Sequence, residues 1–211
     1  MARAPRSAPG RERILDRALE VFLARGFVGT TTDQLAAAAA VSKQTLYKEF
    51  GDKEGVFVAL IEHACASVED PFAPLRGDMQ EVRSAQQGIA LLAERFAGSI
   101  LSPRVQRLRR LVIAEAVRFP HLGRLYWEGG FAPTLESVAA CLEVLDHRGL
   151  LAIPDPSAAA QHFAGLLLWI PGNRTMFLVE EPGDPAGLRA EIDAGCAAFL
   201  RAYAPSEPAA R

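Results

Sequence analysis

Residues 30–53 read Thr-Thr-Thr-Asp-Gln-Leu-Ala-Ala-Ala-Ala-Ala-Val-Ser-Lys-Gln-Thr-Leu-Tyr-Lys-Glu-Phe-Gly-Asp-Lys. Two short helical patterns meet within this stretch at a tight turn. The second begins at Ser42, a residue type that caps helix N-termini, and ends on the aromatic side chain of Phe50. Between them the helix carries a polar and basic outer face. This layout is typical of a helix-turn-helix, whose second helix enters the major groove of DNA.

Capping residues divide this part of the chain into four helices. Thr31 and Gln34 have the spacing of a capping box, and Ser42 and Asp52 are placed to cap the two helices that follow. Before them, an apolar stripe predicts a first helix that Gly26 ends. We therefore expect a helix over about residues 11–25, a second from about 32, a third over 43–50 and a fourth over 53–69. The first three form a DNA-binding head, residues 10–54, and the fourth links it to the rest.

The remainder of the chain is expected to be a larger helical body, residues 70–203. The chain is 50% hydrophobic, and runs that alternate apolar and polar residues are scarce, so the fold class is all-α with about nine to ten helices. Proline, glycine and capping residues place further helices over about 79–101, 103–118, 120–129, 133–147, 156–170 and 185–203. Pro171-Gly172 should kink or end the helix before it. Residues 1–9 read as a flexible arm and 204–211 as a disordered tail.

Composition excludes several classes of protein. The three cysteines and four histidines show no metal-ligand spacing, so we expect no metal, no cofactor and a reduced, cytoplasmic setting. The longest apolar run, residues 163–170, is too short to span a bilayer, and no signal peptide is evident. Residues 1–50 carry eight Lys/Arg and five Asp/Glu, a net charge of +3, against −2 for the whole chain. A positive N-terminal part on an acidic remainder suits phosphate contact by that part alone.

Helical geometry separates a core side from a reading side in residues 43–50. At about 100° per residue, Leu46 and Phe50 share one side, while Gln44, Thr45 and Lys48 face roughly the opposite way. Gln can bond adenine, Thr can touch a thymine methyl, and Lys can reach guanine or phosphate, so we assign base contacts to these three residues. Phosphate contacts are expected from residues on the flank of this helix or near helix N-termini: Thr31, Thr32, Lys43, Tyr47 and Lys53.

These residues resemble the TetR/AcrR family of bacterial repressors. The resemblance covers residues 14–60, through Ile14-Leu-Asp-Arg-Ala-Leu-Glu-Val-Phe-Leu-Ala-Arg-Gly-Phe27, Thr31-Thr32, Val41-Ser-Lys-Gln-Thr-Leu-Tyr-Lys-Glu-Phe50 and Asp52-Lys-Glu54. It implies an all-α homodimer with a three-helix DNA-binding head and a body that holds a small-molecule pocket and the dimer interface. It also implies base contacts by Gln44 and Thr45, and phosphate contacts by Thr32, Tyr47, Lys48 and Lys53. Residues 111–127 are similar to the AefR-type C-terminal domain of this family.

Two residues depart from the family pattern. Family members usually have glycine in the turn where this chain has Ala40, and if that position needs a positive φ, alanine costs about 1 kcal/mol. They also often have glycine where Gln44 stands. The longer side chain should add base readout, so we expect a more particular operator here.

The resemblance also directs attention to a pocket and a dimer interface in the body. A pocket is expected from large or polar side chains, namely Trp127, Phe131, His162, Trp169 and Met176, with His121 as a further polar candidate. The wide apolar faces of residues 133–147 and 156–170 suit a four-helix interface between two subunits, with Leu135, Val138, Leu142, Phe163, Leu166 and Ile170 as candidates.

The sequence thus predicts a homodimeric, ligand-responsive transcriptional regulator whose partners are a double-stranded DNA operator and an unidentified small molecule. The alternatives are a helical enzyme and a helix-turn-helix used for contact with another protein. The enzyme is disfavoured because paired carboxylates, spaced His/Cys/Asp groups and a glycine-rich phosphate loop are all missing from the sequence.

Overall fold

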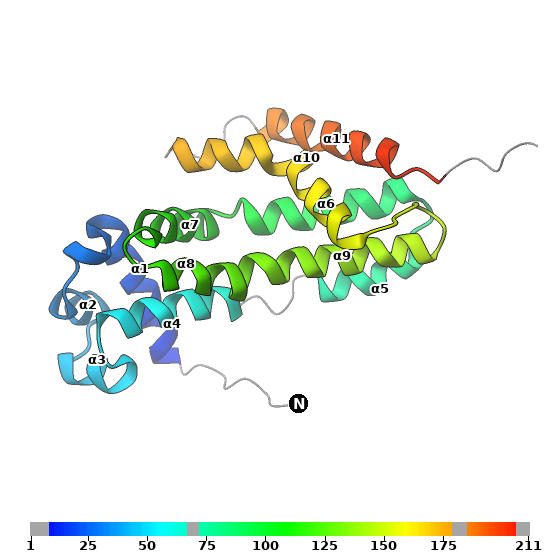
Figure 1. The fold of residues 1–211 in the computed structure, drawn as a ribbon. Coiled ribbons are helices and arrows are strands. Elements are labelled where there is room, and N and C mark those ends of the chain that lie inside the picture. The colour runs from blue at the N-terminus through cyan, green and yellow to red at the C-terminus, as the bar shows by residue number, and fades with distance from the viewer. Residues whose placement is uncertain (1–8, 67–71, 179–184, 206–211) are drawn as a thin grey trace, which may run out of the picture. The chain divides into compact units, whose positions relative to one another are not determined.

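The computed structural model describes residues 9–66, 72–178 and 185–205, and within these ranges every regular element is a helix (Figure 1). The predicted all-α fold class is confirmed. The chain forms two compact units, one from Met1–Val68 with Arg107–Gly130 and the other from Glu69–Gln106 with Phe131–Arg211. The limits of the head and the body expected from the sequence remain a prediction. In the structure, residues 107–130 pack with the N-terminal unit.

The N-terminal unit is built around one aromatic and aliphatic core. Phe22 and Phe57 are fully buried and meet edge to face, with ring centroids 5.0 Å apart. Phe27 packs against both rings because the backbone changes direction at Gly26, whose φ of 67° and ψ of 172° are not helical. The helices of this unit are α1 (Pro9–Gly29), α2 (Thr32–Ala39), α3 (Lys43–Phe50), α4 (Lys53–Ala66), the second half of α7 (Pro103–Ala116) and α8 (Pro120–Tyr126).

The second unit has its own core. Phe163 lies at its centre, with the rings of Phe96 and Phe199 5.7 Å and 5.3 Å away. Ser84 and Asp155 cap two of its helices by accepting hydrogen bonds from Gln87 N and Ala158 N. Its helices are α5 (Ala73–Glu81), α6 (Ala85–Ile100), α9 (Ala132–His147), α10 (Pro156–Phe177) and α11 (Pro185–Ala202), of which α10 packs against α9 and α11.

Two predicted helix boundaries are wrong. Residues 79–101 do not form one helix, because the backbone extends at Val82 and a new helix starts after the Ser84 cap. The helix that begins at Pro120 does not stop at Gly129-Gly130 but passes through a π-helical turn, η1 (Trp127–Phe131), directly into α9. A Cβ on Gly130 would lie 2.8 Å from Cys65 Sγ, so this glycine permits close packing rather than ending a helix.

A further predicted helix end lies too early in the chain. The helix from Pro156 continues past Pro171 to Phe177, so the predicted stop at Pro171-Gly172 is wrong. The ribbon of α10 is bent rather than straight (Figure 1). Helix α4 is described as far as Ala66, so its expected extension to residue 69 lies outside the described residues, as do positions 1–8 of the arm and 206–211 of the tail.

Candidate nucleic-acid interface

The start of α2 has the local geometry that the sequence predicts. Gln34 N donates to Thr31 Oγ1 over 3.3 Å, and Thr31 N donates to Gln34 Oε1 over 2.9 Å, which completes the capping box. Thr30, just before it, is buried and donates its hydroxyl to Gly26 O over 2.7 Å. The hydroxyl of Thr30 therefore ties the entry of α2 to the kink at the end of α1.

The turn between α2 and α3 depends on Ala40. This residue has φ 54° and ψ 43°, and it has the only positive φ among the non-glycine residues that the structure describes. Its N–H and that of Val41 donate back to Ala37 O and Ala36 O over 3.1 Å and 3.0 Å, which closes the end of α2. The left-handed conformation is the one in which alanine pays a penalty and glycine does not.

Helix α3 has the two sides expected from its sequence. Leu46 is fully buried, and Phe50 is half-buried beneath the guanidinium of Arg11, 5.2 Å from the ring centroid. Gln44 and Lys48 are exposed on the other side.

Ser42 caps α3 and also restrains a predicted base-contact residue. Its Oγ accepts from Thr45 N over 3.0 Å and lies 2.8 Å from Thr45 Oγ1. The hydroxyl of Thr45 is thus held by the cap, and its methyl group is the part left for a thymine.

The predicted phosphate-contact lysines both have partners within the protein. Lys43 Nζ lies 2.8 Å from Asp33 Oδ1, and the hydrogen bond and charge of Asp33 raise the pKa of Lys43. Lys53 Nζ donates to Phe27 O over 2.7 Å and to Val28 O over 3.4 Å, and it lies 4.6 Å from the centre of the Phe27 ring. Lys53 therefore supports the end of α1. The phosphate contacts assigned to Thr31, Thr32, Lys43, Tyr47 and Lys53 stay predictions.

Two structural residues of the interface were missed by sequence reasoning. Buried Glu115 on α7 accepts a hydrogen bond from Phe27 N over 2.8 Å, just after the kink at Gly26. Gly55 on α4 lies so close to the end of α3 that a Cβ there would be 1.8 Å from Phe50 O. Glu115 lies far along the chain from its partner, and no spacing rule points to it; a glycine three residues after the Asp52 cap was the only signal for Gly55.

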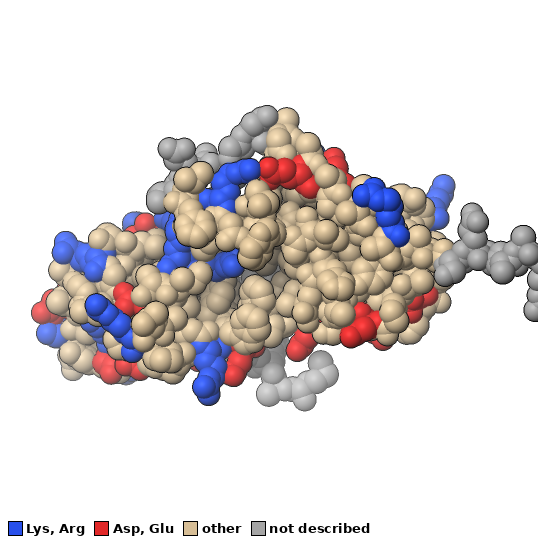
Figure 2. Space-filling view, turned by 45° about the horizontal axis from the view of Figure 1, so that its top comes forward, with Lys and Arg blue, Asp and Glu red and all other residues tan. Residues whose placement is uncertain are grey.

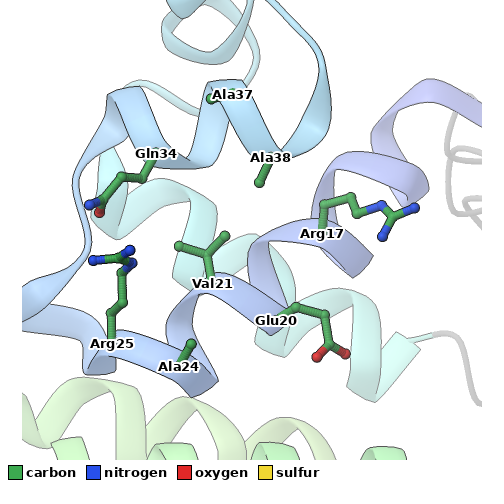
Figure 3. Close-up of a pocket in the computed structure, with 8 residues that line it drawn as sticks. All are labelled: Arg17, Glu20, Val21, Ala24, Arg25, Gln34, Ala37 and Ala38. Carbon is green, nitrogen blue, oxygen red and sulfur yellow. The ribbon is translucent and has the colours of Figure 1, made fainter.

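The outer surface of α1 and α2 carries an open hollow of about 540 Å³ (Figure 3). Four of its lining side chains are apolar and four are polar or charged (Figure 3): Val21, Ala24, Ala37 and Ala38, and Arg17, Glu20, Arg25 and Gln34. On the face that Figure 2 shows, basic side chains gather mainly over this unit, with acidic ones among them. The hollow is a surface groove rather than an enclosed ligand cavity.

The structure reduces the set of candidate residues for the dimer interface. Val138, Leu142 and Phe163 are fully buried in the core of the second unit, so assigning them to contacts with a partner subunit is wrong. Leu135 is half-buried, while Leu166 and Ile170 are exposed on α10 and stay candidates.

Some of the predicted pocket residues lie at the surface of their own unit, and the pocket assignment stays a prediction. Trp169 is 69% exposed, and exposed His162 is 2.7 Å from the hydroxyl of Tyr203, so neither lines a closed cavity of the unit. Trp127 is also more than half exposed, whereas Phe131 and Met176 are partly buried. The further candidate His121 contacts Glu54 Oε1 through Nε2 over 2.9 Å.

Among the described residues, no helix is both long and apolar enough to cross a membrane, and no three His, Cys, Asp or Glu side chains are grouped to hold a metal ion.

Two protein-family models match most of the chain. Residues 14–60 match the family described as bacterial regulatory proteins, tetR family, and residues 87–205 match the AefR-like transcriptional repressor C-terminal domain. The chain belongs to the TetR family of transcriptional regulators. The TetR regulators are DNA-binding proteins and not enzymes, so the enzyme alternative is excluded.

Solved TetR-family structures cover nearly the whole chain. A protein of Mesorhizobium loti described as a TetR-family regulator is 37% identical, with a TM-score of 0.85 over 95% of this chain and 99% of that one. The flavonoid-responsive regulator FrrA is 26% identical, with a TM-score of 0.72 over 95% of this chain and all of FrrA.

Curated transcriptional regulators match shorter parts of the chain. The repressor NicS of Pseudomonas putida is 34% identical over 83 residues, 39% of each chain. The regulator SrpR of Pseudomonas putida is 39% identical over 64 residues, 30% of each chain. These matches span well under two thirds of the relatives' own length.

Proposed function

We propose that this TetR-family chain is a homodimeric repressor that binds a palindromic operator and releases it when a small molecule binds the body. The observation that carries the proposal is the exposed face of α3, where Gln44, Thr45 and Lys48 stand opposite buried Leu46. Side chains of these types read base edges in the major groove. Caps at both ends of the turn hold this face in place before DNA arrives.

An apolar stripe on α10 supports the dimer. Leu166, Trp169, Ile170 and Phe177 recur at helical spacing and are 45%, 69%, 56% and 80% exposed. An exposed stripe of large apolar side chains usually marks a protein interface. Two such stripes packed together would pair the subunits and present two copies of α3 about 34–36 Å apart, one turn of DNA.

Release by a small molecule follows from the family's architecture and from a relative's response. FrrA, which aligns with 95% of this chain, is flavonoid-responsive, which supports a planar aromatic effector as the first class to test. An effector weakens DNA binding only to the extent that it prefers the form of the dimer that does not fit the operator. A thermal shift with a flavonoid panel, repeated with operator present, tests both binding and release: an effector must stabilise the protein and lower its operator affinity.

The DNA-binding proposal is tested with the promoter region of the chain's own gene and with random DNA across a salt series. A dimer that neutralises about eight phosphates should give a log–log slope near −7. Gln44→Ala should relax the preference for the operator sequence. Lys48→Ala shows which contact Lys48 makes: loss of a phosphate contact weakens binding to all sequences alike, whereas loss of a base contact relaxes sequence preference. Equal affinity of the wild type for both DNAs would refute the proposal.

The dimer proposal is tested by sedimentation of a charged variant. Ile170→Asp should shift the protein to monomers, since it would bury two unpaired carboxylates at a paired α10 face. Val117→Asp is the matched control, because Val117 is also exposed but lies on the N-terminal unit. A dimer that survives Ile170→Asp, or is lost equally with Val117→Asp, excludes this face.

A further inference from the structure

An ion pair joins the first turns of the two helices of the helix-turn-helix. Asp33 lies in the first turn of α2 and Lys43 in the first turn of α3, and their side chains meet over 2.8 Å. Both side chains remain largely exposed, 70% for Asp33 and 50% for Lys43. Lys43 directly precedes Gln44 and Thr45 on the reading helix, so the pair borders the surface that faces the bases.

The pair changes what Lys43 can do for binding. Non-specific affinity for DNA comes from cations that displace counterions from phosphates. A lysine held by a neighbouring carboxylate contributes little to that process, and the carboxylate itself repels phosphate. An exposed ion pair of this kind is also cheap to break when a better partner is present. Lys43 can therefore leave Asp33 for a phosphate or base only where the DNA is seated closely.

We propose that Asp33 is a specificity-determining residue: its ion pair with Lys43 persists on random DNA and breaks on the operator. This inference rests on the proposed reading of DNA by α3 and extends it. Asp33 acts by weakening binding to the wrong sequences more than binding to the right one, in the way that repulsive elements give specificity elsewhere.

The test uses the full chain, random duplex DNA and a palindrome selected from a random-sequence library by the wild type. Asp33→Asn should tighten binding to random DNA by about fivefold per bound protomer at about 0.15 M salt, from a slope of about 0.9 per neutralised phosphate. The salt slope on random DNA should steepen by the same 0.9. Affinity for the selected palindrome should rise by less, so the specificity ratio falls.

Lys43 variants show whether Asp33 acts through its partner. Lys43→Gln alone should change random-DNA affinity by less than about twofold but weaken palindrome binding, and Lys43→Gln combined with Asp33→Asn should remove the gain on random DNA. Asp78→Asn on α5 makes the same charge change on the other unit and should leave the ratio unchanged.

Two results would overturn the proposal. If Asp33→Asn raises affinity for both DNAs equally, or if its gain survives Lys43→Gln, then Asp33 contributes only a general negative charge. A wild type without sequence preference would instead overturn DNA reading by α3 itself, and that failure is visible before any variant is made. Circular dichroism of each variant checks that the fold is retained.

Discussion

The left-handed conformation of Ala40 predicts that glycine at this position stabilises the protein. Alanine pays about 1–2 kcal/mol in this region of φ and ψ because its Cβ crowds the following carbonyl oxygen. Glycine avoids this cost but loses about 0.4–1 kcal/mol more conformational entropy on folding. Ala40 is exposed, so removing its methyl group sacrifices little packing. Ala40→Gly should therefore raise the free energy of unfolding of the N-terminal unit by about 0.5–1 kcal/mol.

Urea denaturation followed by circular dichroism measures this change, with the m-value checked for constancy. Ala38→Gly is the matched control, because Ala38 is exposed in the same helix but has ordinary helical geometry. That substitution should destabilise by about 1 kcal/mol. The two glycine variants are thus predicted to shift the midpoint in opposite directions. If Ala40→Gly lowers stability as Ala38→Gly does, the left-handed turn inferred for Ala40 is wrong.

Three further predictions concern buried or closely packed groups among the described residues. Glu115→Ala leaves a buried backbone N–H without its acceptor and should cost about 1–3 kcal/mol in a urea titration, whereas Glu115→Gln, which keeps an acceptor, should cost less. Gly55→Ala should destabilise by about 3 kcal/mol or more because its Cβ would overlap a carbonyl of α3, while Gly98→Ala, in open space on α6, should stabilise by about 1 kcal/mol. Burial raises the pKa of Cys65 to about 11 and the pKa of Tyr126 to about 12. Both groups therefore lose their protons at lower pH in the unfolded chain than in the folded one, and the free energy of unfolding should fall as pH rises from about 9 to 12. The same pH series on Tyr126→Phe should show a smaller fall.

Short-range signals account for most of what the sequence predicted correctly. The caps at Thr31, Ser42, Asp52, Ser102 and Asp155 all accept hydrogen bonds from N–H groups three residues later. Such bonds depend on spacing along the chain alone, so the residue types at i and i+3 are enough to find them. The division of α3 into a buried and an exposed side follows equally from local helical geometry.

Contacts between distant residues could not be predicted in the same way. Glu115 and Phe27 are 88 positions apart, and only the folded unit brings the carboxylate to the kink after α1. Gly129-Gly130 looked like a helix stop because glycine weakens helices by about 1 kcal/mol each. In the structure that weakness is outweighed by packing, since Gly130 fits against Cys65 where any side chain would collide.

Lys53 shows how the structure changes the interpretation of a predicted DNA contact. An ammonium group has three donors, and Phe27 O and Val28 O accept from two of them. We expect a phosphate to accept from the third, in which case the lysine fixes the end of α1 and contacts DNA at the same time. Loss of DNA affinity in Lys53→Ala would then combine a missing phosphate contact with a displaced α1. Lys48 has no such internal role within the described contacts, which makes it the cleaner probe of charge alone. If Lys53→Ala reduces both the free energy of unfolding and the affinity for every DNA, whereas Lys48→Ala reduces only affinity, Lys53 serves both functions. If Lys53→Ala leaves stability unchanged, its contacts with α1 are incidental and phosphate is its principal partner.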